Sequence, residues 1–219
     1  MAMGIAEKPA VEFFFDTSCP WSYLALERVR EAALRTGSRV VYRPVLVDEV
    51  LQRANPGFPA DRTDPLPARA RYQAKDLADW ARYCGLVLRK PQPWPLRVEW
   101  AQRGAVVAAG TGQAFAYLTA VFAALFADNR DIRERAVVEA VATEAGLDPA
   151  SFAARIGDRQ TQLQVESNGA ELVARGGFGT PTFLVGEDLY FGNDRLPLVE
   201  AALARQAGMR LVLPGAHGA

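Results

Sequence analysis

Histidine is almost absent from this sequence. The sole histidine, His217, lies in a tail rich in Gly and Ala that we expect to fray. Serine-histidine hydrolases, cysteine-histidine proteases and most zinc enzymes need an imidazole as a base or as a metal ligand. These classes are therefore excluded, and any chemistry must rest on a thiol, hydroxyls, carboxylates or a cofactor.

Cysteine is scarce as well, since the chain has only Cys19 and Cys84. Two cysteines are too few for a disulfide scaffold or for a zinc site with four cysteine ligands, so we predict no metal site. The reducing cytoplasm fits this cysteine usage best. The first ten residues lack a basic stretch followed by a long apolar run, so we expect no secretory signal and no export.

An excess of charge of one sign is also lacking, because 25 basic residues balance 25 acidic ones. No global field would draw the protein to nucleic acid or to an anionic membrane, so we expect neither as a partner. The segment 104–127 holds no charged residue and is long enough to span a membrane. It is mostly Ala, however, with Gly-Thr-Gly-Gln in its middle, so a buried helix is the better interpretation.

Apolar residues make up 50% of the chain, enough for one sizeable core or two small ones. Residues 11–15 are rich in β-forming side chains and predict a buried strand. From Trp21 to Gly37, apolar and small residues recur at helical spacing, and residues 39–46 predict a second strand. The segment 11–46 is therefore a β-α-β unit whose two strands run parallel.

The middle of the chain is predicted to be helical. Residues 52–67 have no periodicity and predict a long proline-rich loop, and Lys90 to Pro95 predict a second loop. Asp148 and Pro149 are expected to cap and open one of the later helices. The predicted helices cover residues 68–84, 98–127, 130–145, 150–155 and 158–175.

The C-terminal part returns to strands. Residues 181–185 and 189–191 predict a hairpin with a turn at 186–188, and a helix follows over residues 195–206. The order is therefore β-α-β, a helical block, then β-β-α. Nothing repeats at a fixed period, which excludes a solenoid.

Cys19 stands between the first strand and the first helix. Backbone N–H groups and the helix dipole favour an anion there, so we expect a stabilised thiolate with a lowered pKa. The alternative is a small buried hydrophobic residue. A dithiol oxidoreductase needs a second cysteine three positions on, where this chain has Ser22, so Cys19 cannot close a local disulfide. Cys84 is interpreted as structural.

Three segments carry a resemblance to a known family. Asp16 to Leu24 reads DTSCPWSYL, Gly179 to Leu184 reads GTPTFL, and Phe191 to Leu196 reads FGNDRL. Together they resemble the 2-hydroxychromene-2-carboxylate isomerases and kappa-class glutathione transferases of the DsbA-like thioredoxin superfamily. The resemblance implies an α/β thioredoxin-like fold with an inserted all-helical domain. It divides the chain into a thioredoxin-like domain, 1–66 and 178–219, and a helical insertion, 67–177.

The resemblance also implies a glutathione site. It places the sulfur of glutathione beside Cys19, at the N-terminus of the first helix. Thr180 would pair through its backbone with the cysteinyl part of glutathione, and Pro181 would follow a cis peptide bond. Asn193 and Asp194 match the pair that receives the γ-glutamyl group. The alternatives are that Pro181 is an ordinary strand-edge proline and that Asn193 and Asp194 cap the last helix.

Two further residues are matched to glutathione by the resemblance alone. Asn55 corresponds to a glutathione-contacting asparagine in the proline-rich loop. Arg69 aligns with a family lysine, and its guanidinium would suit the glycyl carboxylate. The alternative for Arg69 is an ordinary solvated charge.

The sequence departs from the family at Cys19, where the relatives generally carry serine. A thiol is a poorer hydrogen-bond donor than a hydroxyl. Cys19 is the predicted catalytic residue, and it could assist bound glutathione, form a mixed disulfide with it or act as the nucleophile itself. The leading hypothesis is a glutathione-dependent isomerase or transferase acting on a small aromatic, conjugated keto-acid-like substrate, with Tyr23, Phe58 and Trp94 as candidate walls of its pocket. The alternatives are a monothiol oxidoreductase that uses Cys19 and a binding module without catalysis. A homodimer is expected from the family.

Overall fold

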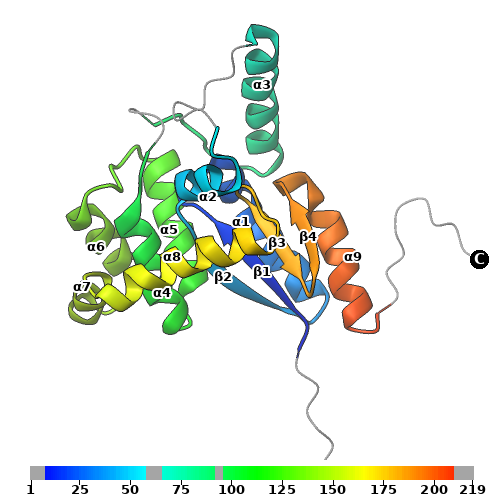
Figure 1. Ribbon diagram of the computed structural model, residues 1–219. Coiled ribbons are helices and arrows are strands. Elements are labelled where there is room, and N and C mark those ends of the chain that lie inside the picture. The colour runs from blue at the N-terminus through cyan, green and yellow to red at the C-terminus, as the bar shows by residue number, and fades with distance from the viewer. Residues whose placement is uncertain (1–7, 58–65, 92–95, 210–219) are drawn as a thin grey trace, which may run out of the picture.

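The computed structural model describes residues 8–57, 66–91 and 96–209, and within them the order of elements agrees with the predicted fold (Figure 1). A β-α-β unit comes first, a series of helices follows, and a β-hairpin with a closing helix ends the described chain. The elements are β1 (Ala10–Phe15), α1 (Pro20–Arg35), β2 (Arg39–Pro44), α2 (Val47–Ala54), α3 (Pro67–Tyr83), α4 (Glu99–Gly110), α5 (Ala114–Phe126), α6 (Arg135–Glu144), α7 (Pro149–Ile156), α8 (Arg159–Ala174), β3 (Thr182–Val185), β4 (Asp188–Phe191), the short 3₁₀ helix η1 (Asn193–Arg195) and α9 (Leu196–Gln206).

The four strands form one mixed sheet in the order β2-β1-β3-β4. β1 pairs parallel to β2 and antiparallel to β3, and β3 pairs antiparallel to β4. Because β1 and β3 run in opposite directions, the C-terminal end of β1 and the N-terminal end of β3 lie side by side at the same end of the sheet. The sequence places Cys19 just after the first of these ends and Pro181 just before the second.

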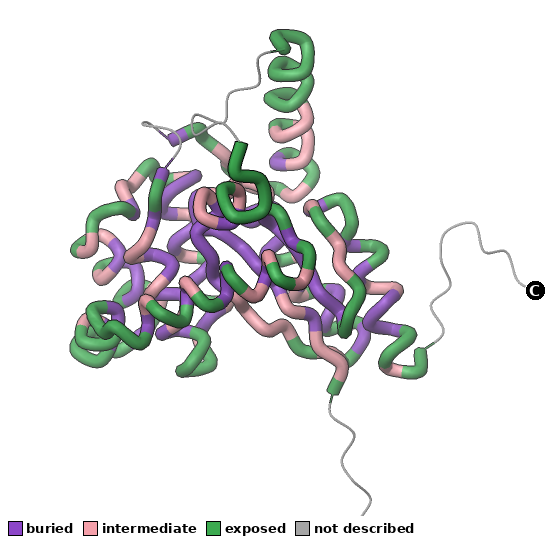
Figure 2. Tube along the Cα trace, viewed as in Figure 1, coloured by how far each residue is buried: buried purple, intermediate pink, exposed green. Residues whose placement is uncertain are grey.

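Both faces of β1 are covered, which explains its continuous run of phenylalanines. Phe13 and Phe15 are fully buried in the larger apolar cluster, with side chains of α1, α5 and α9. Phe14 points to the opposite face and packs with Val50 of α2 and Leu172 of α8. Figure 2 shows this buried centre surrounded by exposed outer helices.

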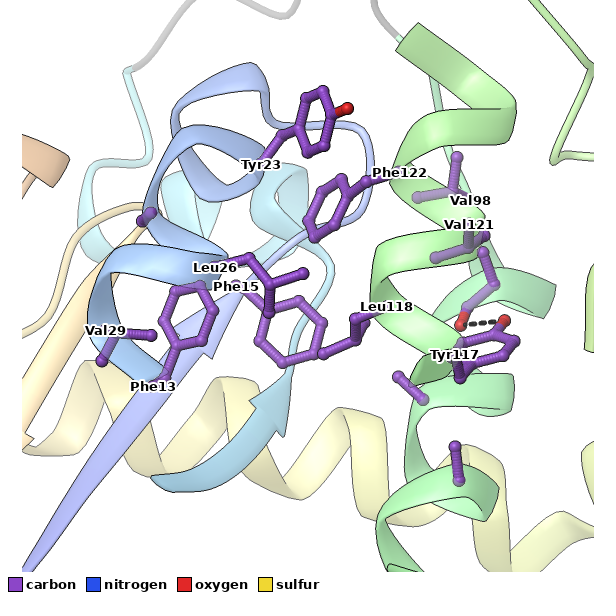
Figure 3. Close-up of a cluster of buried hydrophobic side chains, with 14 of the residues drawn as sticks. Phe13, Phe15, Tyr23, Leu26, Val29, Val98, Tyr117, Leu118, Val121 and Phe122 are labelled. Atoms are coloured by element: carbon purple, nitrogen blue, oxygen red, sulfur yellow. Dashed lines mark hydrogen bonds between the residues drawn. The ribbon is translucent and has the colours of Figure 1, made fainter. Parts of the chain in front are cut away.

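The helical block packs against α1 as well as against the sheet itself. Tyr23 on α1 stacks on Phe122 of α5, with ring centroids 5.4 Å apart, and Leu118 and Val121 of α5 lie in the same cluster (Figure 3). The apolar core is therefore continuous between the sheet and the helical block. The domain boundaries at 66–67 and 177–178 stay predictions.

The helix predicted over 98–127 is two helices. α4 ends at Gly110 and α5 begins at Ala114, and Gly112 between them has φ of 75°, which glycine adopts without steric cost. The two helices fold back on each other closely: a Cβ at Gly104 would collide with the Tyr117 hydroxyl and lie 2.9 Å from the Phe152 ring. Within the described residues, no helix is apolar over a length that could cross a bilayer.

Other local predictions differ in detail. The loop predicted from residue 52 begins only after α2, which the sequence pattern did not reveal because Val47 and Val50 are its only buried residues. The second strand ends at Pro44 rather than Leu46. Asp148 caps α7, as predicted: its carboxylate accepts a hydrogen bond from the Ser151 N–H at 2.8 Å, and Pro149 opens the helix.

Candidate active site at the N-terminus of α1

Cys19 is the N-cap residue of α1 and is half-buried. Its N–H donates to the Asp16 carbonyl at 2.9 Å, and its own carbonyl accepts the N–H groups of Ser22 and Tyr23 at 3.0 and 3.2 Å. Pro20 opens the helix, where a missing N–H costs nothing. The strand-turn-helix expected from the sequence is therefore present, with Cys19 at the point where the helix begins.

Asp16 holds the turn that leads to Cys19. One of its carboxylate oxygens accepts both the N–H and the hydroxyl of Ser18 at 2.7 Å, and the other accepts the Val47 N–H at 2.8 Å. Val47 is the first residue of α2. A single buried carboxylate thus fixes the start of α2 against the loop that carries Cys19.

Gln102 supports the same loop from the helical block. It lies on α4 with its side chain fully buried, accepts the Thr17 N–H at 3.2 Å and donates to the carbonyls of Phe15, at 2.9 Å, and Val45. These three backbone groups lie at the ends of β1 and β2. Gln102 is therefore a cross-link between the helical block and the loop before Cys19.

The peptide bond between Thr180 and Pro181 is cis, which confirms the expectation for this position. The Cys19 thiol donates to the Thr180 carbonyl with Sγ 3.4 Å from the oxygen. Pro181 lies directly before β3, where Thr182 begins the pairing. The structure thus brings Cys19 and Thr180 into direct contact, although they are 161 positions apart in the sequence.

Three buried hydroxyls belong to this neighbourhood: those of Thr17, Ser22 and Thr180. Within the part of the chain that the structure describes, none of the three has a hydrogen-bond partner. Buried polar atoms are normally paired, so an unpartnered one calls for a physical reason such as a bound ligand. Ser22 is fully buried one helical turn after Cys19, and its hydroxyl and N–H both favour a negative charge on the Cys19 sulfur.

The expected lowering of the Cys19 pKa is not found. Burial raises the pKa of the Cys19 thiol above its ordinary value, and the carboxylate of Asp16 acts in the same direction. The side chains of Thr180 and Ser22 and the Ser22 N–H favour the thiolate and so lower the pKa, but they do not outweigh burial. The helix N-terminus favours the thiolate, as the sequence predicts. The sulfur, however, lies against the Thr180 carbonyl and loses solvent there, and this loss raises the pKa. Burial therefore disfavours the thiolate that the sequence predicts for Cys19.

The segment Gly192 to Arg195 joins the cis-proline loop through one hydrogen bond, in which the Gly192 N–H donates to the Pro181 carbonyl at 2.9 Å. Asn193 is buried, and the Arg28 guanidinium donates to both its side-chain oxygen and its backbone carbonyl. Asp194 is exposed and forms an ion pair with Arg195 at 2.8 Å. The N-cap of α9 is Arg195, so neither Asn193 nor Asp194 caps that helix.

Asn55 and Arg69 lie farther out. Asn55 is exposed at the C-terminal end of α2, and its side-chain oxygen accepts the Gly57 N–H at 3.3 Å. Arg69 is exposed in the first turn of α3, a helix that projects from the body of the molecule (Figure 1). Their roles in binding stay predictions.

Of the three predicted pocket walls, the structure describes only Tyr23. Tyr23 is buried in the core, where it stacks on Phe122 and Phe126. Phe58 and Trp94 lie outside the described residues. Cys84 and Cys19 are both free thiols; Cys84 is half-buried at the end of α3, with Sγ 3.9 Å from the Leu24 carbonyl. Burial raises the Cys84 pKa, which agrees with a structural role.

Comparison with known sequence families places this arrangement among known proteins. Residues 10–204 match the DsbA-like thioredoxin domain. The chain belongs to this family. Among its DsbA-like relatives, the 2-hydroxychromene-2-carboxylate isomerase of Sphingobium xenophagum is 28% identical over 193 residues, which cover 88% of this chain and 97% of that protein. The enzyme of the same name from Pseudomonas putida is 27% identical over 195 residues, which cover 89% and 94%.

Solved DsbA-like structures give the same result. A 2-hydroxychromene-2-carboxylate isomerase structure superposes with a TM-score of 0.78 and 26% identity, covering 90% of this chain and 95% of its own. A cytosolic disulfide reductase, DsbM from Pseudomonas aeruginosa with GSH, superposes with a TM-score of 0.63 and 19% identity, covering 91% and 98%. The second likeness shows the shared fold. The fold and the family predicted from the sequence are confirmed.

Two residues of the DsbA-like site were missed by sequence reasoning. Gln102 and Arg28 each sit on a helix among residues of ordinary helical composition, and their polar partners are far away in the chain. Gln102 interrupts the apolar pattern of its helix, which is a weak signal for a buried polar contact. Arg28 is one of several charged residues on α1, and no feature of the sequence distinguishes it.

Proposed function

We propose that this protein is a glutathione-dependent isomerase of the 2-hydroxychromene-2-carboxylate isomerase type, acting on a small aromatic, conjugated keto-acid-like substrate. The names of its relatives support an isomerase, and the match to them extends over most of the chain. The observation that carries the proposal is the state of the Cys19 sulfur. A half-buried thiol that donates to the Thr180 carbonyl and has a raised pKa is a poor nucleophile, so the reacting sulfur would come from a bound thiol.

The residues at the N-terminus of α1 fit glutathione. When bound, glutathione supplies a thiolate that adds reversibly to a conjugated double bond and so permits rotation about it. The buried Ser22 hydroxyl, which has no partner among the described residues, is available to donate to a negatively charged sulfur in this place. A hydroxyl donates more strongly than a thiol, so Ser22 would supply the hydrogen bond that Cys19 provides only weakly.

The cis-proline loop and the segment after β4 would hold the rest of the tripeptide. Thr180 offers its backbone beside Cys19, and its carbonyl has a second lone pair beyond the one that accepts the Cys19 thiol. The exposed carboxylate of Asp194 would receive the ammonium end of the γ-glutamyl group, in place of its present partner Arg195. Asn55 and Arg69 remain proposed contacts at the periphery of the site.

A monothiol oxidoreductase is the second candidate, because Cys19 itself stands at the nucleophile position of a thioredoxin-like fold. In that reaction the Cys19 thiolate would attack the sulfur of a glutathione mixed disulfide and release the partner thiol as the leaving group. Free glutathione would then resolve the new mixed disulfide, with oxidised glutathione as the product. The raised pKa of Cys19 opposes this route at neutral pH.

One pair of steady-state assays separates the two candidates. The wild-type protein is supplied with 2-hydroxychromene-2-carboxylate with and without reduced glutathione, and in parallel with a glutathionylated peptide. The proposal expects isomerisation that requires glutathione and no catalysed reduction of the peptide. Reduction of the peptide with no isomerisation would overturn the proposal in favour of the monothiol oxidoreductase. Isomerisation at the same rate without glutathione would also overturn it.

A further inference from the structure

Arg28 on α1 connects three elements of the molecule. Its guanidinium donates to the backbone carbonyl of Asn193 at 2.9 Å and also to the Asn193 side-chain oxygen. The same guanidinium lies over the ring of Trp80 on α3, with its carbon 4.7 Å from the ring centroid. One side chain thus joins the helix that carries Cys19 to the segment before α9 and to the base of α3.

The contact with Asn193 is a strong restraint because of where it lies. Asn193 is buried, and a hydrogen bond from a charged donor is stronger than one between neutral groups. Both bonds come from one guanidinium nitrogen, Nη1, which therefore ties the side chain and the backbone of Asn193 together. Asp194 is exposed and directly follows Asn193 in the chain. The restraint on Asn193 therefore also restrains the backbone that carries the Asp194 carboxylate.

The contact also closes a ring of interactions around the candidate site. Cys19 begins α1, and its thiol donates to the Thr180 carbonyl. Pro181 follows Thr180, and its carbonyl accepts the Gly192 N–H at 2.9 Å. Asn193 follows Gly192 and returns to α1 through Arg28. Arg28 therefore bonds the segment that carries Asp194 back to the helix that begins at Cys19.

We propose that Arg28 is a positioning residue for the γ-glutamyl end of glutathione: it holds Asn193 so that the Asp194 carboxylate stands at a fixed distance from Cys19. This inference rests on the proposed function, because it assumes that glutathione is the ligand of the site. Arg28 acts through Asn193 and does not itself touch the ligand.

Arg30 offers a matched control on the same helix. It is half-buried like Arg28, and its guanidinium carbon lies 4.3 Å above the ring of Phe115. It forms an ion pair with Glu27 at 2.9 Å and makes no contact with Asn193. Arg28→Met and Arg30→Met each remove a guanidinium of α1 that lies over an aromatic ring of another helix. Only the first change releases Asn193.

The test measures the affinity of the wild-type protein, Arg28→Met, Arg28→Lys and Arg30→Met for two thiols by isothermal titration calorimetry. Reduced glutathione carries the γ-glutamyl group, and cysteinylglycine lacks it. We expect the wild-type protein and Arg30→Met to prefer glutathione. In Arg28→Met we expect the ratio of glutathione affinity to cysteinylglycine affinity to fall about tenfold, because glutathione binds more weakly while cysteinylglycine binding is unchanged. For Arg28→Lys we expect a ratio between those of the wild-type protein and Arg28→Met.

Each other result has a definite meaning. An unchanged preference in Arg28→Met overturns the inference and leaves the proposed function standing. Equal weakening of both thiols in Arg28→Met, with a lowered melting temperature, shows a merely structural role and also overturns it. A wild-type protein that binds neither thiol overturns the proposed function and, with it, this inference.

Discussion

Cys19 and Ser22 have opposite properties although one turn of helix separates them. The Cys19 sulfur is covered, donates to a carbonyl and has a raised pKa. The Ser22 hydroxyl is buried with no hydrogen-bond partner in the described part of the chain, and it favours a negative charge on a sulfur beside it. We therefore propose that the reacting sulfur belongs to a bound thiol and that the Ser22 hydroxyl stabilises its thiolate form.

The first prediction concerns the pKa of Cys19, measured as the pH dependence of its alkylation in a Cys84→Ser variant. Because burial raises this pKa, the alkylation rate of the folded protein should have its inflection above that of the same chain in denaturant. The sign also bears on stability. The unfolded chain releases the thiol proton more readily, so the free energy of unfolding should fall as pH rises above the ordinary thiol pKa. An inflection below that of the denatured chain would contradict the structure.

The second prediction concerns Ser22→Ala. If the Ser22 hydroxyl donates to the thiolate of bound glutathione, its removal should lower kcat for isomerisation about tenfold or more and raise the pKa of the bound glutathione thiol. The pKa is followed by the ultraviolet absorbance of the thiolate as a function of pH. Ser38→Ala is the control, because Ser38 follows the far end of α1 and bonds with Thr36. Equal activity in the two variants would contradict a role for the Ser22 hydroxyl in stabilising the glutathione thiolate.

Among the helices, α4 supports the loop between β1 and α1. Gln102 reaches from α4 to backbone groups at the ends of β1 and β2, and Gly104 lets α4 approach Tyr117 on α5. The helical block therefore has a role in the candidate site although Arg69 is the only predicted glutathione contact that it supplies. It fixes the turn from which Cys19 begins the helix.

The third prediction tests this support through Gln102→Met. The change keeps the length of the side chain and leaves the Thr17 N–H and the Val45 carbonyl without Gln102. We expect the free energy of unfolding to fall by about 2 to 4 kcal/mol, since each buried unpaired group costs on the order of 1 to 3 kcal/mol. Denaturant unfolding gives the value. Gln162→Met on α8, where the side chain bonds with the half-buried Glu166, should cost less than about 0.5 kcal/mol. Equal losses in both variants would show that Gln102 is not a special support.

Much of the fold follows from local sequence chemistry, and the exceptions have physical causes. Cys19 was identified because a strand, a turn and a proline mark its position within a few residues, whereas Pro181 was assigned through the family resemblance. The break between α4 and α5 was missed because Gly112 stands in a run of small residues that also suits a continuous helix. Arg28 was missed because its partner Asn193 is 165 positions away, and the raised pKa of Cys19 was missed because desolvation depends on tertiary packing.

At the scale of the whole molecule, the site lies where distant parts of the chain meet. The first strand and helix bring Cys19 and Arg28, the hairpin brings Thr180 and Pro181, and the segment before α9 brings Asn193. α3 extends away from this assembly and touches α1 at its base through Trp80 (Figure 1). A ligand at Cys19 would therefore contact several elements at once, which suits a tripeptide.

The central claim is that the reacting sulfur belongs to glutathione and not to Cys19. The most direct measurement is the rate of 2-hydroxychromene-2-carboxylate isomerisation by Cys19→Ser as a function of glutathione concentration. The account predicts saturation with glutathione and a maximal rate no lower than that of the wild-type protein, because serine supplies a stronger donor at the same place. Loss of all glutathione-dependent isomerisation in a folded Cys19→Ser protein would contradict it.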